Sequence, residues 1–174
     1  MLKIVSTIWL KIRHPSVKTN QYHSVRPGTE IILRKGGRLI LGKNVITRGR
    51  VTFSVKSGVL RIGKDISFNC GDIVACMQDI SIGDDCAFGP NVVIYDHDHQ
   101  FSGKGFAVKE FNCSPVVIED HVWVGANAVI LRGTHIGRGC VIGAGAVVKG
   151  DIPAHSLVKG DRKITVEPIK EEKK

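Results

Sequence analysis

Four titratable side chains follow one another near the middle of the chain, in the stretch Asp96-His97-Asp98-His99. In an extended strand, alternate residues point to the same face, so the two aspartates would share one side and the two histidines the other. An imidazole titrates near neutral pH and can remove a proton from a reacting group, and a neighbouring carboxylate can fix its tautomer. This stretch is therefore the first candidate for a catalytic site, with solvated turn residues as the alternative for the aspartates.

A six-residue period places this stretch within a regular scaffold. Steps of six from Ile118 reach only β-branched apolar residues, which are Val124, Ile130, Ile136, Ile142 and Val148. The same frame extends backwards through Ile94, Phe88 and Ile82, and two offset runs begin at Ile62 and Leu41. Such a period is typical of short strands and tight turns that stack into coils around a dry interior. The sequence thus predicts an all-β fold, a parallel β-helix built from hexapeptide repeats over most of residues 40–150.

The repeat frame also divides the chain into segments. We expect residues 1–29 to cap the helix, residues 30–158 to form it, and residues 159–174 to form a basic tail. A polar, glycine-containing stretch interrupts the frame and predicts a protruding loop at 100–114. Near the N-terminus, Ile4, Ile8 and Ile12 have helical spacing and predict a short helix over one end of the core. A weak membrane-surface association is the alternative, because basic residues flank this segment.

Composition narrows the classes of protein. The 174 residues are 43% hydrophobic but only 6% aromatic, and the net charge of +9 favours anionic partners such as phosphates and coenzymes. Few aromatics and scattered charges argue against nucleic-acid binding. The five cysteines form no CxxC pair, which favours free thiols in a reducing, cytoplasmic compartment. The apolar runs at the N-terminus are too short for a signal peptide or a spanning helix.

Several motifs give the chain a more specific resemblance. They are Asn69 within Ile-Ser-Phe-Asn-Cys-Gly, Pro90-Asn91-Val92, the Asp96–His99 stretch, Val122-Trp123-Val124-Gly125-Ala126, Ile142-Gly143-Ala144-Gly145-Ala146 and Asp151-Ile152-Pro153. With these motifs and its Ile-Gly-x4 repeats, the chain resembles the hexapeptide acyltransferases, and among them the galactoside, maltose, capsule and lipopolysaccharide O-acetyltransferases. The resemblance implies a left-handed helix, acetyl-CoA as cosubstrate without a metal, and a homotrimer whose sites lie in the grooves between neighbouring helices.

The resemblance also implies roles for individual residues. His97 matches the general base, and Asn69, Asp96 and His99 are candidates for binding the acceptor sugar. Alternatives are a left-handed corner position for Asn69, orientation of the imidazole for Asp96 and simple solvent exposure for His99. Residues expected to contact the cosubstrate are Trp123 along the pantetheine arm, Ala126 through its N–H at the oxyanion, and Ala144, Lys149, Gly150 and Lys163 at coenzyme A.

These features predict an acetyl-CoA-dependent O-acetyltransferase that modifies a sugar hydroxyl in surface-polysaccharide or lipopolysaccharide synthesis. An N-acetyltransferase acting on an amino sugar nucleotide is the main alternative, because the same base could deprotonate an amine. A γ-class carbonic anhydrase would need three histidines converging on a metal, for which His97, His99 and His121 are the candidates. A scaffold without enzymatic activity is the remaining class.

Overall fold

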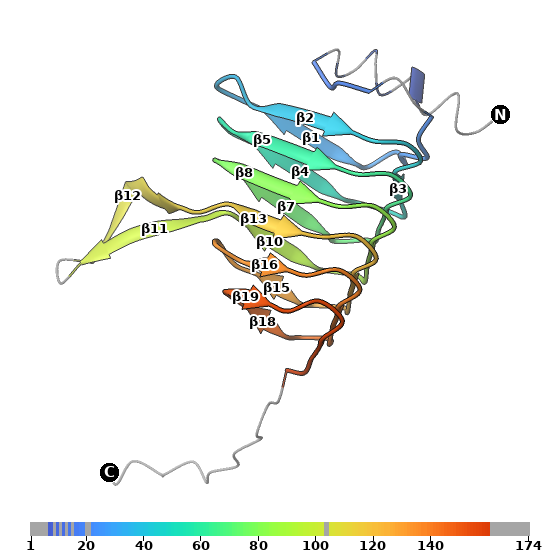
Figure 1. Cartoon of the computed structure of the whole chain (residues 1–174). Coiled ribbons are helices and arrows are strands. Elements are labelled where there is room, and N and C mark those ends of the chain that lie inside the picture. The colour runs from blue at the N-terminus through green and yellow to red at the C-terminus, as the bar shows by residue number, and fades with distance from the viewer. Residues whose placement is uncertain are drawn as a thin grey trace, which may run out of the picture.

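The computed structural model describes residues 7, 8, 10, 12, 14, 16–19, 22–102 and 105–160. Most of them form three parallel sheets of six strands each, wound as a single coil (Figure 1). The chain descends from the N-terminal end in a left-handed sense, as the predicted left-handed parallel β-helix requires.

Each coil contributes one strand to each sheet. The first sheet contains β1 (Glu30–Leu33), β4 (Thr52–Val55), β7 (Ile73–Cys76), β10 (Val93–Tyr95), β15 (Val129–Ile130) and β18 (Val147–Val148). The second contains β2 (Arg38–Leu41), β5 (Val59–Ile62), β8 (Asp79–Ile82), β13 (Val116–Ile118), β16 (His135–Ile136) and β19 (Asp151–Ile152). The third contains β3 (Ile46–Thr47), β6 (Ser67–Phe68), β9 (Ala87–Phe88), β14 (Trp123–Val124), β17 (Val141–Ile142) and β20 (Leu157–Val158).

The hexapeptide frame forms the core, as predicted. Its large residues from Ile82 to Val148 are all buried and point into the coil. Toward the N-terminal end, Phe68 packs edge-on against Phe53 at 5.0 Å and stacks on Phe88 at 4.8 Å between ring centroids. Burial of each such side chain contributes on the order of 2 kcal/mol, so the stack of inward residues is the main source of stability.

Coil length explains why the N-terminal repeats are out of frame. Register partners are 22 residues apart at Glu30 and Thr52 but 18 apart at Val129 and Val147. The N-terminal coils therefore have longer strands and turns than three hexapeptides supply.

The predicted loop is a β-hairpin, and it begins earlier than expected. Strands β11 (His97–Ser102) and β12 (Gly105–Cys113) pair antiparallel and project away from the helix (Figure 1). His97 is thus the first residue of the hairpin and not the end of a helix strand. The protruding loop expected near residues 100–114 is thus present, and its base lies three residues earlier because the repeat frame says nothing about residues that leave the coil.

The N-terminal residues add a partial coil at the open end of the helix. Lys18 and Ser24 make isolated parallel bridges to Ile40 and Ile46. Before them, residues 7, 8, 10 and 12 are helical, and Leu10 is the fully buried one, whereas Ile8 and Ile12 are exposed. Within the described residues, no helix is long and apolar enough to cross a bilayer.

Candidate active site

The turns of the helix form three edges, which we name by a residue on each. The His97 edge joins strands of the first sheet to strands of the second, the Asp84 edge joins the second to the third, and the Asn69 edge joins the third to the next strand of the first. Every described residue that was considered for chemistry lies on or beside one of these edges.

His97 forms a pair with Asp96 on the His97 edge. The Nδ1 atom of His97 lies 2.8 Å from Oδ1 of Asp96. The Asp96 side chain is fully buried, whereas 17% of the His97 side chain is exposed. A carboxylate at this distance holds the Nδ1 proton, which leaves Nε2 as the unprotonated nitrogen of the neutral ring.

Asp96 is held by the preceding coil. Its two carboxylate oxygens accept hydrogen bonds from the backbone N–H groups of Met77, Gln78 and Asp79 at 2.7–3.0 Å. Burial opposes ionisation, but the bonds from His97, from these N–H groups and from the Cys76 thiol hold the pKa of Asp96 below its ordinary value. Asp96 has no exposed surface for a sugar, so of the roles considered for it only orientation of the imidazole fits its position.

Aromatic rings flank His97 on two sides. The rings of Tyr95 and Phe111 lie edge-on to the imidazole, at 5.9 and 5.6 Å between centroids. Phe111 also contacts His99, whose ring centroid is 4.4 Å away, so the two histidines do share one face of β11. The Nδ1 atom of His99 lies 3.1 Å from the carbonyl oxygen of Ala107, and the His99 side chain is exposed.

Sequence reasoning missed Arg132, which lies beside this cluster. Its Nε donates to Oδ2 of Asp98 at 2.6 Å, and that bond is the main reason that the pKa of Asp98 is below its ordinary value. Lys149 lies close enough to lower the same pKa further. The sequence did contain a signal for Arg132. It is a charged residue directly after Ile130 and Leu131, at the turn that the repeat frame places on the His97 edge.

The other predicted site residues lie on or beside the Asn69 edge. Asn69 accepts a hydrogen bond from the N–H of Cys70 at 2.9 Å and has an ordinary negative φ, so it is not the left-handed corner residue that was considered. Trp123 lies on β14 with 56% of its side chain exposed. Ala126 and Ala144 follow β14 and β17 on this edge, and their N–H groups donate to no acceptor within the described part of the chain.

One chain does not bring these two groups together. Asn69 precedes β7, whereas His97 follows β10, which pairs in parallel with β7. The four-residue strand between the two edges spans about 13 Å, which is more than one sugar ring covers. Lys149 and Gly150 follow β18 on the His97 edge, and Lys163 lies outside the described residues.

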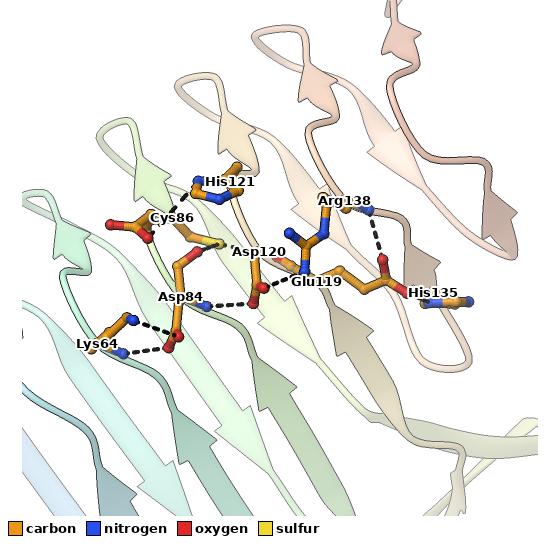
Figure 2. Close-up of polar contacts among 9 residues, drawn as sticks. Lys64, Asp84, Cys86, Glu119, Asp120, His121, His135 and Arg138 are labelled. Carbon is orange, nitrogen blue, oxygen red and sulfur yellow. Dashed lines mark hydrogen bonds and ion pairs between the residues drawn. The ribbon is translucent and has the colours of Figure 1, made fainter.

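The Asp84 edge carries a separate polar ladder (Figure 2). Here Asp120 accepts from the N–H of Asp84 and from Arg138, and Glu119 lies 3.0 Å from His135, which lowers the pKa of Glu119. His121 stands on this edge with a φ of +57°, a corner conformation in which histidine is enriched.

The position of His121 argues against the three-histidine metal site of a γ-class carbonic anhydrase. His121 on the Asp84 edge cannot join His97 and His99 in one metal site within the chain. Among the described residues, no group of three or more His, Cys, Asp or Glu is arranged to hold a metal ion.

Comparisons with known proteins agree with this architecture. Residues 115–149 match the family model described as the hexapeptide repeat of succinyl-transferase. The chain is 30% identical over 138 residues to WbbJ of Escherichia coli (strain K12), named a lipopolysaccharide biosynthesis O-acetyl transferase, with 74% of this chain and 70% of WbbJ covered. It is 32% identical over 153 residues to Rv3034c of Mycobacterium tuberculosis, named an acetyltransferase; the match covers 86% of this chain but only about half (51%) of that relative.

Solved structures extend the comparison. The hexapeptide-repeat acetyltransferase VCA0836 of Vibrio cholerae, complexed with acetyl coenzyme A, superposes with a TM-score of 0.60 and 28% identity over 75% of this chain and 66% of that one. The N-acyltransferase AntD of Bacillus cereus superposes with a TM-score of 0.71 over 94% of this chain and 89% of its own, but at 21% identity it shows the fold alone. The chain belongs to the hexapeptide-repeat acetyltransferase family.

Proposed function

We propose that this protein is an acetyl-CoA-dependent O-acetyltransferase that modifies a sugar hydroxyl during surface-polysaccharide or lipopolysaccharide synthesis in the cytoplasm. The observation that carries the proposal is the Asp96–His97 pair, in which a buried ionised carboxylate presents a partly exposed imidazole on a helix of this family. The names of WbbJ and of the VCA0836 complex support the reaction and the cosubstrate.

The geometry supports a simple sequence of proton transfers. His97 Nε2 takes the proton of the acceptor hydroxyl as its oxygen attacks the thioester carbonyl of acetyl-CoA. A tetrahedral oxyanion forms, and a backbone N–H such as that of Ala126 stabilises it. The C–S bond then breaks, and the imidazolium returns the proton to the leaving thiolate of coenzyme A. Asp96 stays ionised throughout and stabilises the imidazolium.

The site is completed between copies of the chain in this proposal. His97 on one edge and Asn69, Trp123 and Ala126 at the other cannot serve one acceptor and one cosubstrate within a single chain. In a closed trimer, the His97 edge of one copy meets the Asn69 edge of the next, because a cyclic arrangement repeats one heterologous contact.

The surfaces of the three sheets support this assembly. Outward positions of the first sheet are apolar from Ile73 onward, with Val147 64% exposed, and the third sheet exposes Trp123 and Leu157. The second sheet is polar at most outward positions, which include the ion pair of Arg61 with Asp79 at 2.7 Å. The apolar first sheet, which ends at the His97 edge, is a surface that one copy can bury against the next, and the polar second sheet is suited to face solvent.

The direct test is release of coenzyme A in the presence of matched acceptors. We expect acetyl-CoA to bind and an acetyl ester to form on a sugar hydroxyl, identified by mass spectrometry and by its lability to mild base. Formation of a base-stable amide on an amino sugar nucleotide would instead support N-acetylation. A relative from Staphylococcus aureus (strain JH9) that is named an N-acetyltransferase is 53% identical over 49 residues, and it supports this alternative reaction. Absence of coenzyme A binding would reject both.

A further inference from the structure

We propose that the acceptor carries a negative charge, a phosphate or a carboxylate, and that Lys56 binds it beside His97. This inference rests on the proposed acetyltransferase function and deepens it by assigning a class of acceptor. Lys56 was not among the site residues expected from the sequence.

Lys56 lies close to His97, on the same edge of the helix. It follows β4 on the His97 edge, and its N–H donates to the carbonyl of Cys76 at 2.9 Å. Its Nζ atom lies 4.6 Å from the ring centroid of Phe111, the same ring that packs against His97 at 5.6 Å. The ammonium is therefore within roughly one Debye length (10 Å at 0.1 M salt) of the imidazole.

Lys56 differs from Arg132, on the same edge, in its partner. Arg132 is paired with Asp98 at 2.6 Å, and elsewhere Arg61 on β5 is paired with Asp79 and, on the Asp84 edge, Lys64 and Arg138 are paired with Asp84 and Asp120. Within the described residues, Lys56 has no carboxylate at ion-pair distance and lies over an aromatic face instead. A cation–π contact places an ammonium without neutralising it, so the charge remains available to a ligand.

The carboxylates of the cluster do not cancel this charge. Asp96 is buried and accepts hydrogen bonds from five groups. Asp98 is paired with Arg132. Glu110 neighbours Phe111 on β12, and strand alternation places it on the opposite face of the hairpin.

The position of Lys56 along the helix indicates which ligand it would bind. In the first sheet, β4 lies two strands before β10 and β18 lies two strands after it, so Lys56 and Lys149 flank His97 on opposite sides, each about 10 Å away along the stack. Lys149, toward the C-terminal end, is the residue expected at coenzyme A. Lys56 then marks the acceptor's side, and two anionic ligands would approach His97 from opposite ends of one groove.

The test compares anionic acceptors with neutral ones in two variants. Hexose 1-phosphates, nucleoside-diphosphate hexoses and sugar carboxylic acids are each paired with the methyl glycoside or methyl ester that lacks the charge. Binding to the coenzyme A-loaded protein is measured by calorimetry, and turnover by coenzyme A release. For wild type we expect the charged member of at least one pair to bind more tightly, with an affinity that falls as salt is raised.

Lys56→Met keeps the apolar stem and removes the charge. It should weaken binding of the charged acceptor about ten- to a hundredfold, as loss of a charged hydrogen bond does, and leave the neutral acceptor and acetyl-CoA unchanged. Lys64→Met, at the Asp84 edge, is the matched control and should change neither. Equal binding of charged and neutral acceptors, or an equal loss of both in Lys56→Met, would overturn the proposal. Transfer to a neutral sugar would still leave the acetyltransferase function standing.

Discussion

The Nδ1 atom of His97 lies 2.8 Å from Oδ1 of Asp96, although the two residues belong to different parts of the fold. Asp96 is anchored to the turn at Met77–Asp79, whereas His97 opens a hairpin that leaves the helix. The bond thus fixes a residue of a projecting element against the rigid stack of coils, and the orientation of the imidazole depends on it.

Replacement of His97 by alanine should lower turnover at least ~10²-fold, the low end for loss of a general base. The hairpin and the coils do not depend on the ring, so acetyl-CoA binding, measured by calorimetry, should persist. His121→Asn on the Asp84 edge is the matched control, because asparagine tolerates the left-handed backbone of that corner. Turnover near that of wild type in His97→Ala would exclude this base.

Asp96→Asn should destabilise the protein and alter catalysis together. The amide presents an NH2 group to backbone donors that the carboxylate accepted, which costs about 1–3 kcal/mol. Because folding lowers the pKa of Asp96, its contribution to stability is present above the ordinary pKa of 3.8 and is lost as pH falls below that value. Urea unfolding of both proteins at pH 7 and at pH 3 should show a difference that shrinks in acid.

The kinetic readout separates orientation from mere stability. If Asp96 orients the imidazole, Asp96→Asn should lower kcat of the folded enzyme and leave the KM for acetyl-CoA near that of wild type, because the amide no longer fixes the Nδ1 proton of His97. An unchanged kcat with reduced stability would leave Asp96 a structural residue only.

Asp72 should give the opposite dependence on pH. It is buried behind the Asn69 edge, where it accepts from the N–H groups of Asn69 and Val92, and burial raises its pKa from 3.8 to about 6. The folded state therefore retains a proton that the unfolded chain has lost, so stability falls as pH rises from about 4 to 6 and is level above that. The expected loss is on the order of 3 kcal/mol. Asp72→Asn should remove this slope in unfolding experiments across pH 4–7, and a slope that persists would contradict the assignment.

Mixed assemblies should recover activity if the site is shared between copies. His97→Ala and Asn69→Ala are each expected to be impaired alone. In randomly co-assembled trimers, about a quarter of the interfaces would join an intact His97 edge to an intact Asn69 edge, because each partner is drawn independently. Coenzyme A release by the co-expressed pair should approach that fraction of wild type. Recovery no greater than the average of the two variants would place each site within one chain.

The hexapeptide frame was predictable because it depends on burial. Every inward residue that the period selected, from Ile82 to Val148, lies in the core, since one large apolar side chain per strand is what a narrow coil can hold. The fold and the family followed from this pattern. His97 could be selected for its chemistry and its place after Ile94.

The remaining features of the site depend on contacts that a period cannot reveal. The burial of Asp96 depends on the turn at Met77, which comes nearly a full coil earlier. Arg132 and Lys56 meet the hairpin only because it folds back beside their edge. The N-terminal helix shows the same limit, because among its described residues Leu10 is buried, whereas Ile8 and Ile12, which set the helical spacing, are exposed.

The hairpin has one further consequence for how such an enzyme can change. Ile82 pairs with Ile118, 36 residues further on, which is the length of two 18-residue coils. The inserted residues thus add the length of one whole coil, and the coils on either side stay in phase. Because β11 and β12 project away from the core, the hairpin can be lengthened, shortened or exchanged without moving an inward side chain. The length of the hairpin and the stability of the scaffold are separable traits in this architecture, and selection can act on one while the other stays constant.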